Sequence, residues 1–284
     1  MIHFPCKERY GWDDFLAMIR ALRSPEGCPW DRTQTHASIR RNFLEETYEA
    51  LDAIDRDDPE NMKEELGDVL MQTAFHARIE EERGRFTMAD VVDGVTRKLL
   101  YRHPHVFGGA SETDASEQAL ENWEERKRTE KGFRTASDAI EAVPHTLPAL
   151  WRAEKIQKKA AKAGFEWENA AHAMEKLEEE TGELREALET GKAYDAPHGV
   201  AEEAGDVLFM TVCVLRMCGI DPEDALHRTC DKFERRFRTV ETLADKPLTD
   251  CTEAELTAYW TRAKQIDAAE RVPAIQEDNK NEQK

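Results

Sequence analysis

The sequence is poor in positive charge and contains no long hydrophobic run. Its 284 residues include 40 Lys and Arg against 59 Asp and Glu, which gives a formal net charge of −19 at pH 7. Such an excess of acid disfavours nucleic acid and anionic membrane surfaces as partners, because like charges repel. No apolar segment approaches the ~20 residues of a transmembrane helix, and the first residues lack the basic and apolar segments of a secretory signal. We therefore expect no nucleic-acid partner and no membrane association.

Cysteines are few and follow no metal-binding spacing. The six lie at positions 6, 28, 213, 218, 230 and 251, and no two form a Cys-x-x-Cys pair, so a zinc site of that kind is not expected. Sparse, unpatterned thiols are typical of a reducing compartment, where disulfides do not persist. We therefore predict a cytoplasmic protein with free thiols.

Short β-branched runs are also rare, and prolines stand between long stretches rich in Ala, Leu, Glu, Lys and Arg. These residues favour helices. Asp58-Pro59-Glu60 and Asp221-Pro222-Glu223 are typical helix starts, with Pro at the first helical position and acid in the first turn. The predicted fold class is therefore all-α. The expected helices lie near residues 10–23, 36–56, 60–82, 87–102, 116–130, 148–163, 169–190, 198–218, 222–244 and 252–270.

The two halves of the sequence resemble each other. Each carries a Glu-Glu-x-x-Glu motif, a Glu-x-x-Asp motif, a Lys and an Arg four apart, and a Trp and a Lys four apart, displaced by 134 to 138 positions. An ordered set at a near-constant displacement indicates a duplicated domain of four or five helices. The predicted boundaries are an N-terminal domain over 1–134, a linker over 135–148, a C-terminal domain over 149–270 and a disordered tail over 271–284.

The repeated acids have the spacing of a metal site. In each half, two acids three residues apart stand on each of two successive predicted helices, so each pair projects from one side of its helix. The pairs are Glu46 with Glu49 and Glu65 with Asp68, and Glu180 with Glu183 and Glu203 with Asp206. Adjacent antiparallel helices would bring four carboxylates together, and these repel one another unless a cation lies among them. Oxygen ligands in that number suit Mg²⁺ or Mn²⁺.

The metal interpretation competes with a solvated acidic face. Asp206 precedes the stretch Val207–Leu215, which is apolar nearly all round and so looks buried, and Asp68 precedes a similar stretch. Acids at the start of a buried helix need a partner or a metal, which favours the metal site over the solvated acidic face.

Basic and aromatic residues repeat at a fixed distance from these acids. Two such pairs, each four residues apart, occur in each half: Lys98 with Arg102 and Trp123 with Lys127, then Lys232 with Arg236 and Trp260 with Lys264. The basic pairs could grip phosphate oxygens, and a Trp ring could cover a base. Ion pairing or a core tryptophan would explain any one pair, but the duplication favours a nucleoside polyphosphate site. The sequence lacks a Gly-rich phosphate loop, so metal and side chains would hold the phosphates.

Together these residues resemble the MazG family of nucleoside triphosphate pyrophosphohydrolases, over about residues 10–270. The segments Gly27–Asp31 (Gly-Cys-Pro-Trp-Asp) and Arg102–Phe107 (Arg-His-Pro-His-Val-Phe) are similar to those of its two-domain members. The resemblance implies an all-α fold, a requirement for Mg²⁺ that Mn²⁺ can meet, and a homodimer. It implies hydrolysis of a nucleoside triphosphate to the monophosphate and pyrophosphate, for control or sanitation of the nucleotide pool.

The resemblance also assigns roles to residues. In the C-terminal copy it implies the magnesium ligands Glu180, Glu183, Glu203 and Asp206, and the nucleotide contacts Lys176, Glu179, Glu180, Lys232, Arg236, Trp260 and Lys264. Glu179, not fully used as a ligand, is the candidate to orient or deprotonate the attacking water. The second candidate site, in the N-terminal copy, comprises Glu45, Glu46, Glu49, Glu65, Asp68, Lys98, Arg102, Trp123 and Lys127.

The two copies depart from each other one helical turn before the acids. Lys176 occupies this position in the second copy, whereas the first has Asn42, with Arg40 and Arg41 at other angles on the helix. In two-domain relatives the C-terminal copy is generally the active one. The resemblance therefore favours the second copy, although both copies carry the metal acids.

Three alternatives compete with this interpretation. One is a related helical hydrolase with a narrower substrate, such as dUTP or phosphoribosyl-ATP, against which the duplication and the Gly27–Asp31 segment argue. A ferritin-like metal bundle needs two Glu-x-x-His motifs, and no His in this sequence has Glu three residues before it. A non-catalytic helical adaptor would explain the amphipathic helices but not the duplicated acids and bases. The preferred base is not identifiable from the spacing.

Overall fold

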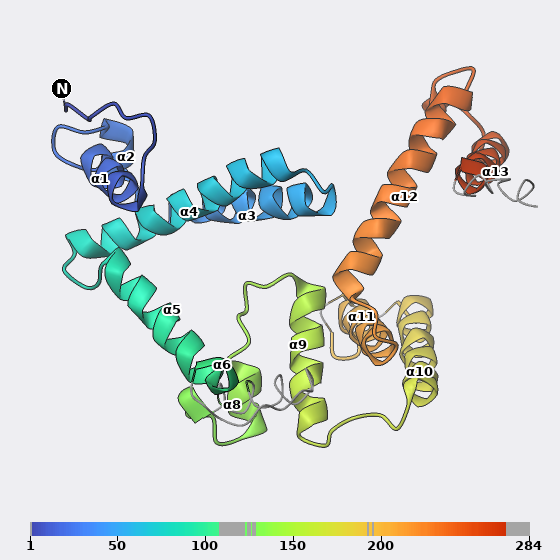
Figure 1. The fold of residues 1–284 in the computed structure, drawn as a ribbon. Coiled ribbons are helices and arrows are strands. Elements are labelled where there is room, and N and C mark those ends of the chain that lie inside the picture. The colour runs from blue at the N-terminus through green and yellow to red at the C-terminus, as the bar shows by residue number, and fades with distance from the viewer. Residues whose placement is uncertain are drawn as a thin grey trace, which may run out of the picture. The chain divides into compact units, whose positions relative to one another are not determined.

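The structure is a computed structural model that describes residues 2–107, 123, 126, 129–191, 193–194 and 196–270. Within this part the chain forms helices joined by loops and contains no strand, which confirms the all-α fold class. It divides into two compact units, Met1–Lys131 and Gly132–Lys284 (Figure 1). The predicted helix over 116–130 lies largely, and the predicted tail over 271–284 wholly, outside the described residues.

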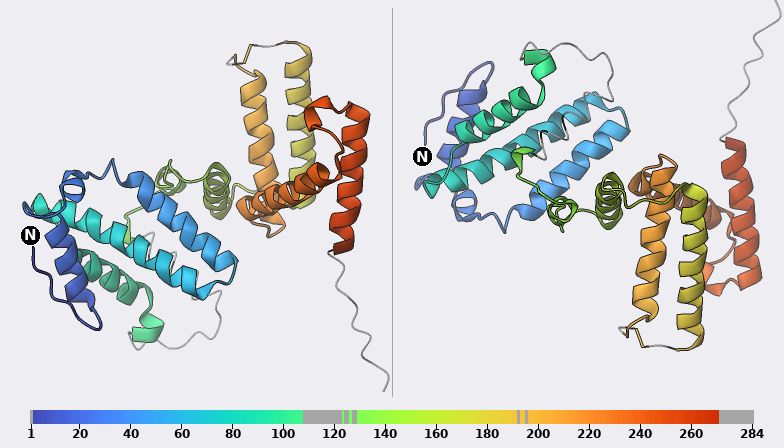
Figure 2. Two further views of the ribbon diagram at one scale, coloured as in Figure 1. Left: turned by 90° about the horizontal axis from the view of Figure 1, so that it is seen from above. Right: turned by 90° about the horizontal axis from the view of Figure 1, so that it is seen from below.

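The first unit is built around a hairpin of two long helices, α3 (Arg40–Asp55) and α4 (Pro59–Glu82), which lie side by side (Figure 2). The remaining helices are α1 (Trp12–Leu22), α2 (Pro29–Thr33), α5 (Met88–Arg102) and α6 (Pro104–Phe107). Ile19 of α1 packs with Phe75 and Ile79 in the C-terminal half of α4. This core fixes one end of the hairpin and leaves the Glu46–Asp68 acids nearer the other end.

The second unit repeats the hairpin in α10 (Ala170–Glu189) and α11 (Val200–Met217), which also lie side by side (Figure 2). The other elements are α8 (Ala136–Glu141), α9 (Ala149–Lys162), α12 (Pro222–Leu243), the short 3₁₀ helix η1 (Leu248–Asp250) and α13 (Glu253–Glu270). Helix α9 packs on α11, and α12 packs on α13. None of the described helices combines the length and the apolar character that a membrane span needs.

Both predicted helix starts are present, one at the start of α4 and the other at the start of α12. The Asp58 carboxylate accepts a hydrogen bond from the backbone N–H of Asn61 at 3.1 Å and so caps α4. Asp221 caps α12 by accepting from the N–H groups of Glu223 and Asp224 at 2.9 and 3.0 Å. These caps satisfy N–H groups that have no partner inside the helix.

The short helices α2, α6 and η1 were not predicted from the sequence, and two further segments differ from the prediction. Helix α3 begins at Arg40 rather than near residue 36, because Thr35 and Ser38 bond to each other through side chains and backbone N–H groups and so hold a turn. The predicted linker over 135–148 contains α8, which starts with a reciprocal capping box between Thr135 and Asp138 and packs on α9. The other predicted helices within the described residues lie within two residues of the observed bounds.

Candidate active site

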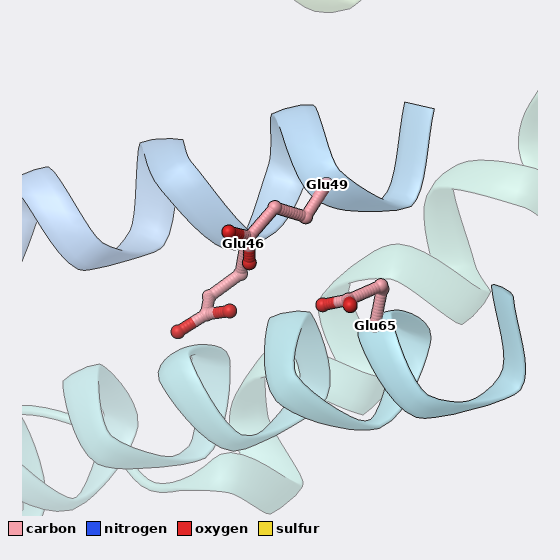
Figure 3. Close-up of side chains that lie close together, drawn as sticks. All are labelled: Glu46, Glu49 and Glu65. Atoms are coloured by element: carbon pink, nitrogen blue, oxygen red, sulfur yellow. The ribbon is translucent and has the colours of Figure 1, made fainter. Parts of the chain in front are cut away.

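The acids of the first copy converge between α3 and α4. Glu46 and Glu49 of α3 and Glu65 of α4 each place a carboxylate oxygen within 4.8 Å of the others. Figure 3 shows the three side chains turned toward one another across the gap between the two helices. Asp68 lies close enough that its negative charge raises the pKa of both Glu46 and Glu65. The sequence spacing therefore predicted this juxtaposition correctly.

The charges of this cluster oppose one another. The pKa of the Glu46 carboxyl is raised first by burial and then by the negative charges of Asp68 and Glu49. The pKa of Glu65 is raised by desolvation and by the charges of Glu49 and Asp68. Gln72, one turn beyond Asp68 on α4 and itself buried, hydrogen-bonds to Glu46 and partly offsets this effect. Carboxylates that raise one another's pKa in this way repel one another, and a cation placed among them would relieve that repulsion.

The second copy repeats the cluster between α10 and α11. Glu180, Glu203 and Asp206 each place a carboxylate oxygen within 4.8 Å of the others, and Glu180 and Glu203 are only 7% and 3% exposed. Glu183 lies one turn after Glu180 on α10 and is exposed, and its pKa is raised by desolvation and by the negative charge of Glu180. Burial and the charges of Glu180 and Glu203 raise the pKa of Asp206 as well. Three of the four acids predicted to bind metal thus lie together here, with Glu183 on the same helix as Glu180.

A cation distinguishes the second cluster from the first. The Lys176 ammonium lies 2.8 Å from a carboxylate oxygen of Glu179 and 2.8 Å from one of Glu180. Hydrogen bonds to these two acids raise the pKa of Lys176, so the side chain stays charged. In the first copy Arg41 instead pairs with Glu45 at 2.8 Å, and Met210 stands in the second copy at the position of Gln72.

The predicted bases and tryptophans lie on other helices. Lys232 and Arg236 are on α12, and Trp260 and Lys264 are on α13, which packs against it. Arg236 donates through Nε to Asp267 of α13 at 2.9 Å, and the rings of Phe233 and Trp260 are 5.3 Å apart. Among the described residues of the second unit, these four side chains make no hydrogen bond or ion pair with the carboxylate cluster.

The first copy arranges its equivalents in a related way. Arg102 of α5 is buried, donates through Nε and Nη2 to Glu130 at 2.9 and 2.7 Å, and stacks its guanidinium 4.8 Å from the ring centre of Trp123. Lys98 lies one turn earlier on the same helix. Lys127 lies outside the described residues.

Comparison with known proteins decides the family. The model of the MazG nucleotide pyrophosphohydrolase domain matches the chain twice, over residues 34–107 and 168–240, and so covers both hairpins with their acids. The chain belongs to the MazG family. The two matches confirm the tandem duplication, and each MazG segment contains one complete set of four acids.

Relatives support this assignment over most of the chain. A protein of Thermotoga maritima named nucleoside triphosphate pyrophosphohydrolase/pyrophosphatase MazG is 42% identical over 256 residues, which is 89% of this chain and 95% of that protein. A nucleoside triphosphate pyrophosphohydrolase of Escherichia coli K12 is 43% identical over 232 residues, 81% of this chain and 87% of that protein. The prediction of a hydrolase that converts nucleoside triphosphates to monophosphate and pyrophosphate is confirmed. MazG hydrolases are generally metal-dependent.

Sequence reasoning missed three groups of polar residues around these MazG sites. Glu130 and Asp267 bind the predicted arginines, and they are 137 positions apart, as Trp123 and Trp260 are, so the displacement test could have found them. The comparison of the two copies could not find Gln72, because the second copy has the apolar Met210 at the equivalent position. His198, whose Nδ1 lies 3.3 Å from Glu203, stands in a loop with no counterpart motif in the first copy.

Proposed function

We propose that this chain hydrolyses nucleoside triphosphates with Mg²⁺ at the second carboxylate cluster. The observation that carries the proposal is the convergence of Glu180, Glu203 and Asp206 between α10 and α11, two of them buried, with Lys176 beside them. Carboxylates are the ligands that Mg²⁺ and Mn²⁺ prefer, and the set contains no thiol that would favour zinc. Within the described residues, Lys176 and His198 are the basic side chains that pair with these acids, so the negative charge exceeds the positive. The donor set therefore fits a divalent cation.

The proposed ligands are Glu180, Glu183, Glu203 and Asp206, with Glu46, Glu49, Glu65 and Asp68 as the equivalent set in the first copy. When bound, magnesium would neutralise the charge of the triphosphate and polarise the α-phosphoryl group. Manganese is expected to substitute, because it accepts the same oxygen ligands.

The chain's own residues would act around that centre. Glu179 is exposed, and Lys176 holds its carboxylate at 2.8 Å, so the carboxylate is positioned to orient or deprotonate the attacking water. Lys232 and Arg236 would stabilise the negative charge that develops on the departing pyrophosphate. Trp260 would stack on the base, and Lys264 would add a cation to the phosphates.

A substrate panel tests this function against its alternatives. We expect the wild-type protein with Mg²⁺ to release pyrophosphate and a nucleoside monophosphate from canonical nucleoside triphosphates. Faster turnover of deaminated nucleoside triphosphates than of canonical ones would indicate a role in sanitation of the nucleotide pool. Turnover of dUTP or phosphoribosyl-ATP alone would assign the narrower substrate instead. No turnover of any substrate with Mg²⁺ or Mn²⁺ would leave a non-catalytic adaptor as the better account.

We further propose that the active assembly is a homodimer. Large apolar side chains remain exposed on both hairpins: Leu66 and Leu70 on α4, and Leu208 and Phe209 on α11. Apolar surface of this kind favours association. The basic residues of α12 and α13 make no hydrogen bond or ion pair with the acids of α10 and α11 in the described part of the unit, so a second copy offers a way to complete the site.

Light scattering tests the dimer. At micromolar concentration we expect about twice the chain mass of 32.6 kDa. Leu208→Asp should lower the mass toward that of one chain, because a buried unpaired carboxylate at the interface is costly. A wild-type particle of the single-chain mass would contradict the proposal.

A further inference from the structure

Each copy contains an acid that binds the predicted phosphate-binding arginine. Asp267 of α13 is 6% exposed, and its Oδ2 accepts a hydrogen bond from Nε of Arg236 of α12 at 2.9 Å. In the first unit, Glu130 accepts from Nε and Nη2 of Arg102 at 2.9 and 2.7 Å. The same type of contact therefore recurs at an equivalent place in both copies, although neither acid belongs to the carboxylate clusters.

The contact leaves much of the Arg236 guanidinium open. A guanidinium carries five N–H donors, of which Nε supplies one and the two Nη atoms supply four. In the described part of the chain Arg236 hydrogen-bonds through Nε, and its Nη donors have no protein partner there. The side chain is 21% exposed, so these donors can reach solvent or a ligand.

An arginine with a purely structural role looks different in the same molecule. Arg23, directly after α1, donates through Nε and Nη2 to Glu82 at 3.0 and 2.8 Å, and through Nη1 to the carbonyls of Asp31 and Gln34 at 2.6 and 3.2 Å. Every nitrogen of that guanidinium is used to hold protein segments together. Arg236 is instead held by one edge, which is the arrangement that suits bidentate binding of phosphate by the other.

We propose that Asp267 is a positioning residue for nucleotide binding. It fixes the Nε edge of Arg236 and turns the Nη donors outward on the pair of helices that also carries Lys232, Trp260 and Lys264. A guanidinium already held in place loses less conformational freedom when phosphate binds, so its binding is tighter. Glu130 makes the corresponding contact to Arg102, but that arginine is buried and uses Nη2 as well as Nε, so the proposal concerns the second copy. The inference rests on the proposed function, in which Arg236 contacts the phosphates.

The test compares substitutions at Asp267 with substitutions at Arg236. We expect Asp267→Ala to raise KM for the nucleoside triphosphate about tenfold, Asp267→Asn to raise it less because an oxygen acceptor for Nε remains, and Asp267→Glu to restore most of the affinity. Arg236→Gln should raise KM by at least as much. In the Arg236→Gln background, Asp267→Ala should have no further effect, because the acid acts through the arginine.

Glu166→Gln is the matched control. Glu166 forms an ion pair with Arg216 at 2.7 Å in the same unit, and neither residue is one of the proposed nucleotide contacts. This variant should lower the unfolding temperature and leave KM unchanged. If Asp267→Ala does not fold, Asp267→Asn carries the same comparison.

The outcomes separate this inference from the proposed function. A wild-type KM in both Asp267→Ala and Asp267→Asn, with a raised KM in Arg236→Gln, would overturn the positioning role of Asp267. The proposed contact of Arg236 with the phosphates would still stand. Independent, additive effects of the two substitutions would also overturn it. A wild-type KM in Arg236→Gln would instead contradict the proposed role of Arg236 itself.

Discussion

Glu180→Gln is expected to abolish most nucleoside triphosphate hydrolysis, whereas Glu46→Gln is expected to leave most of it. Glu180 is buried within the second cluster and contacts both the other acids and Lys176. Replacing a magnesium carboxylate by an amide removes a charged ligand, which should cost several kcal/mol of transition-state stabilisation, or about a hundredfold or more in rate. Glu46 occupies the same place in the first copy, so the two substitutions form a matched pair.

The asymmetry in this prediction comes from the residues beside the two clusters. Lys176 supplies a positive charge to the second, whereas the first has the neutral Asn42 at the equivalent position and the amide of Gln72 beside Glu46. A cation beside the acids attracts the polyphosphate chain, which a neutral amide does not. Steady-state rates of both variants, with circular dichroism to show that both remain helical, provide the measurement. Loss of activity in Glu46→Gln alone would reverse the assignment, and equal partial losses would show that both copies turn over.

Removal of metal is expected to stop turnover completely. The described acids of the site raise one another's pKa, and beside them lies one histidine, His198, and no cysteine among the described residues that pair with them. Without a divalent cation, the triphosphate and the acids repel each other, so neither productive binding nor catalysis should occur.

The measurement is activity after treatment with EDTA, followed by addition of a single metal. Mg²⁺ and Mn²⁺ should each restore turnover, and zinc should not be required. Circular dichroism in EDTA should retain the helical spectrum, because side chains other than the acids form the cores, such as Ile19 with Ile79 in the first unit and Ala173 with Met210 in the second. Full activity in excess chelator would contradict a metal-dependent site.

The fold was largely predictable because helix signals in this sequence are local. Asp58 and Asp221 cap helices where the Asp-Pro-Glu pattern places them, and long stretches without proline allow helices to continue. The start of α3 was not predictable in the same way, because the bond between Thr35 and Ser38 competes with helix formation over a few residues. The capping box of Thr135 and Asp138 was a local signal for α8, but the nearby prolines led to the prediction of a linker there.

The acids of the site were predictable for a different reason. Helical spacing places Glu180 and Glu183 on one side, and a short connection makes the next helix antiparallel, so Glu203 and Asp206 meet them. Contacts between helices that are distant in sequence carry no such rule. Spacing showed that Lys232 and Arg236 lie on one face of α12, but not that Asp267 of α13 binds the arginine through Nε.

A magnesium titration of chelator-treated wild type, Glu46→Gln and Glu180→Gln tests the central claim most directly, since it examines the metal and the choice of copy in one assay. The wild type and Glu46→Gln should regain pyrophosphate release along nearly the same curve of rate against Mg²⁺ concentration. Glu180→Gln should regain about one hundredth of that rate or less at any concentration. Recovery of Glu180→Gln to the wild-type rate at the same Mg²⁺ concentration would show that the second carboxylate cluster is not the catalytic metal centre.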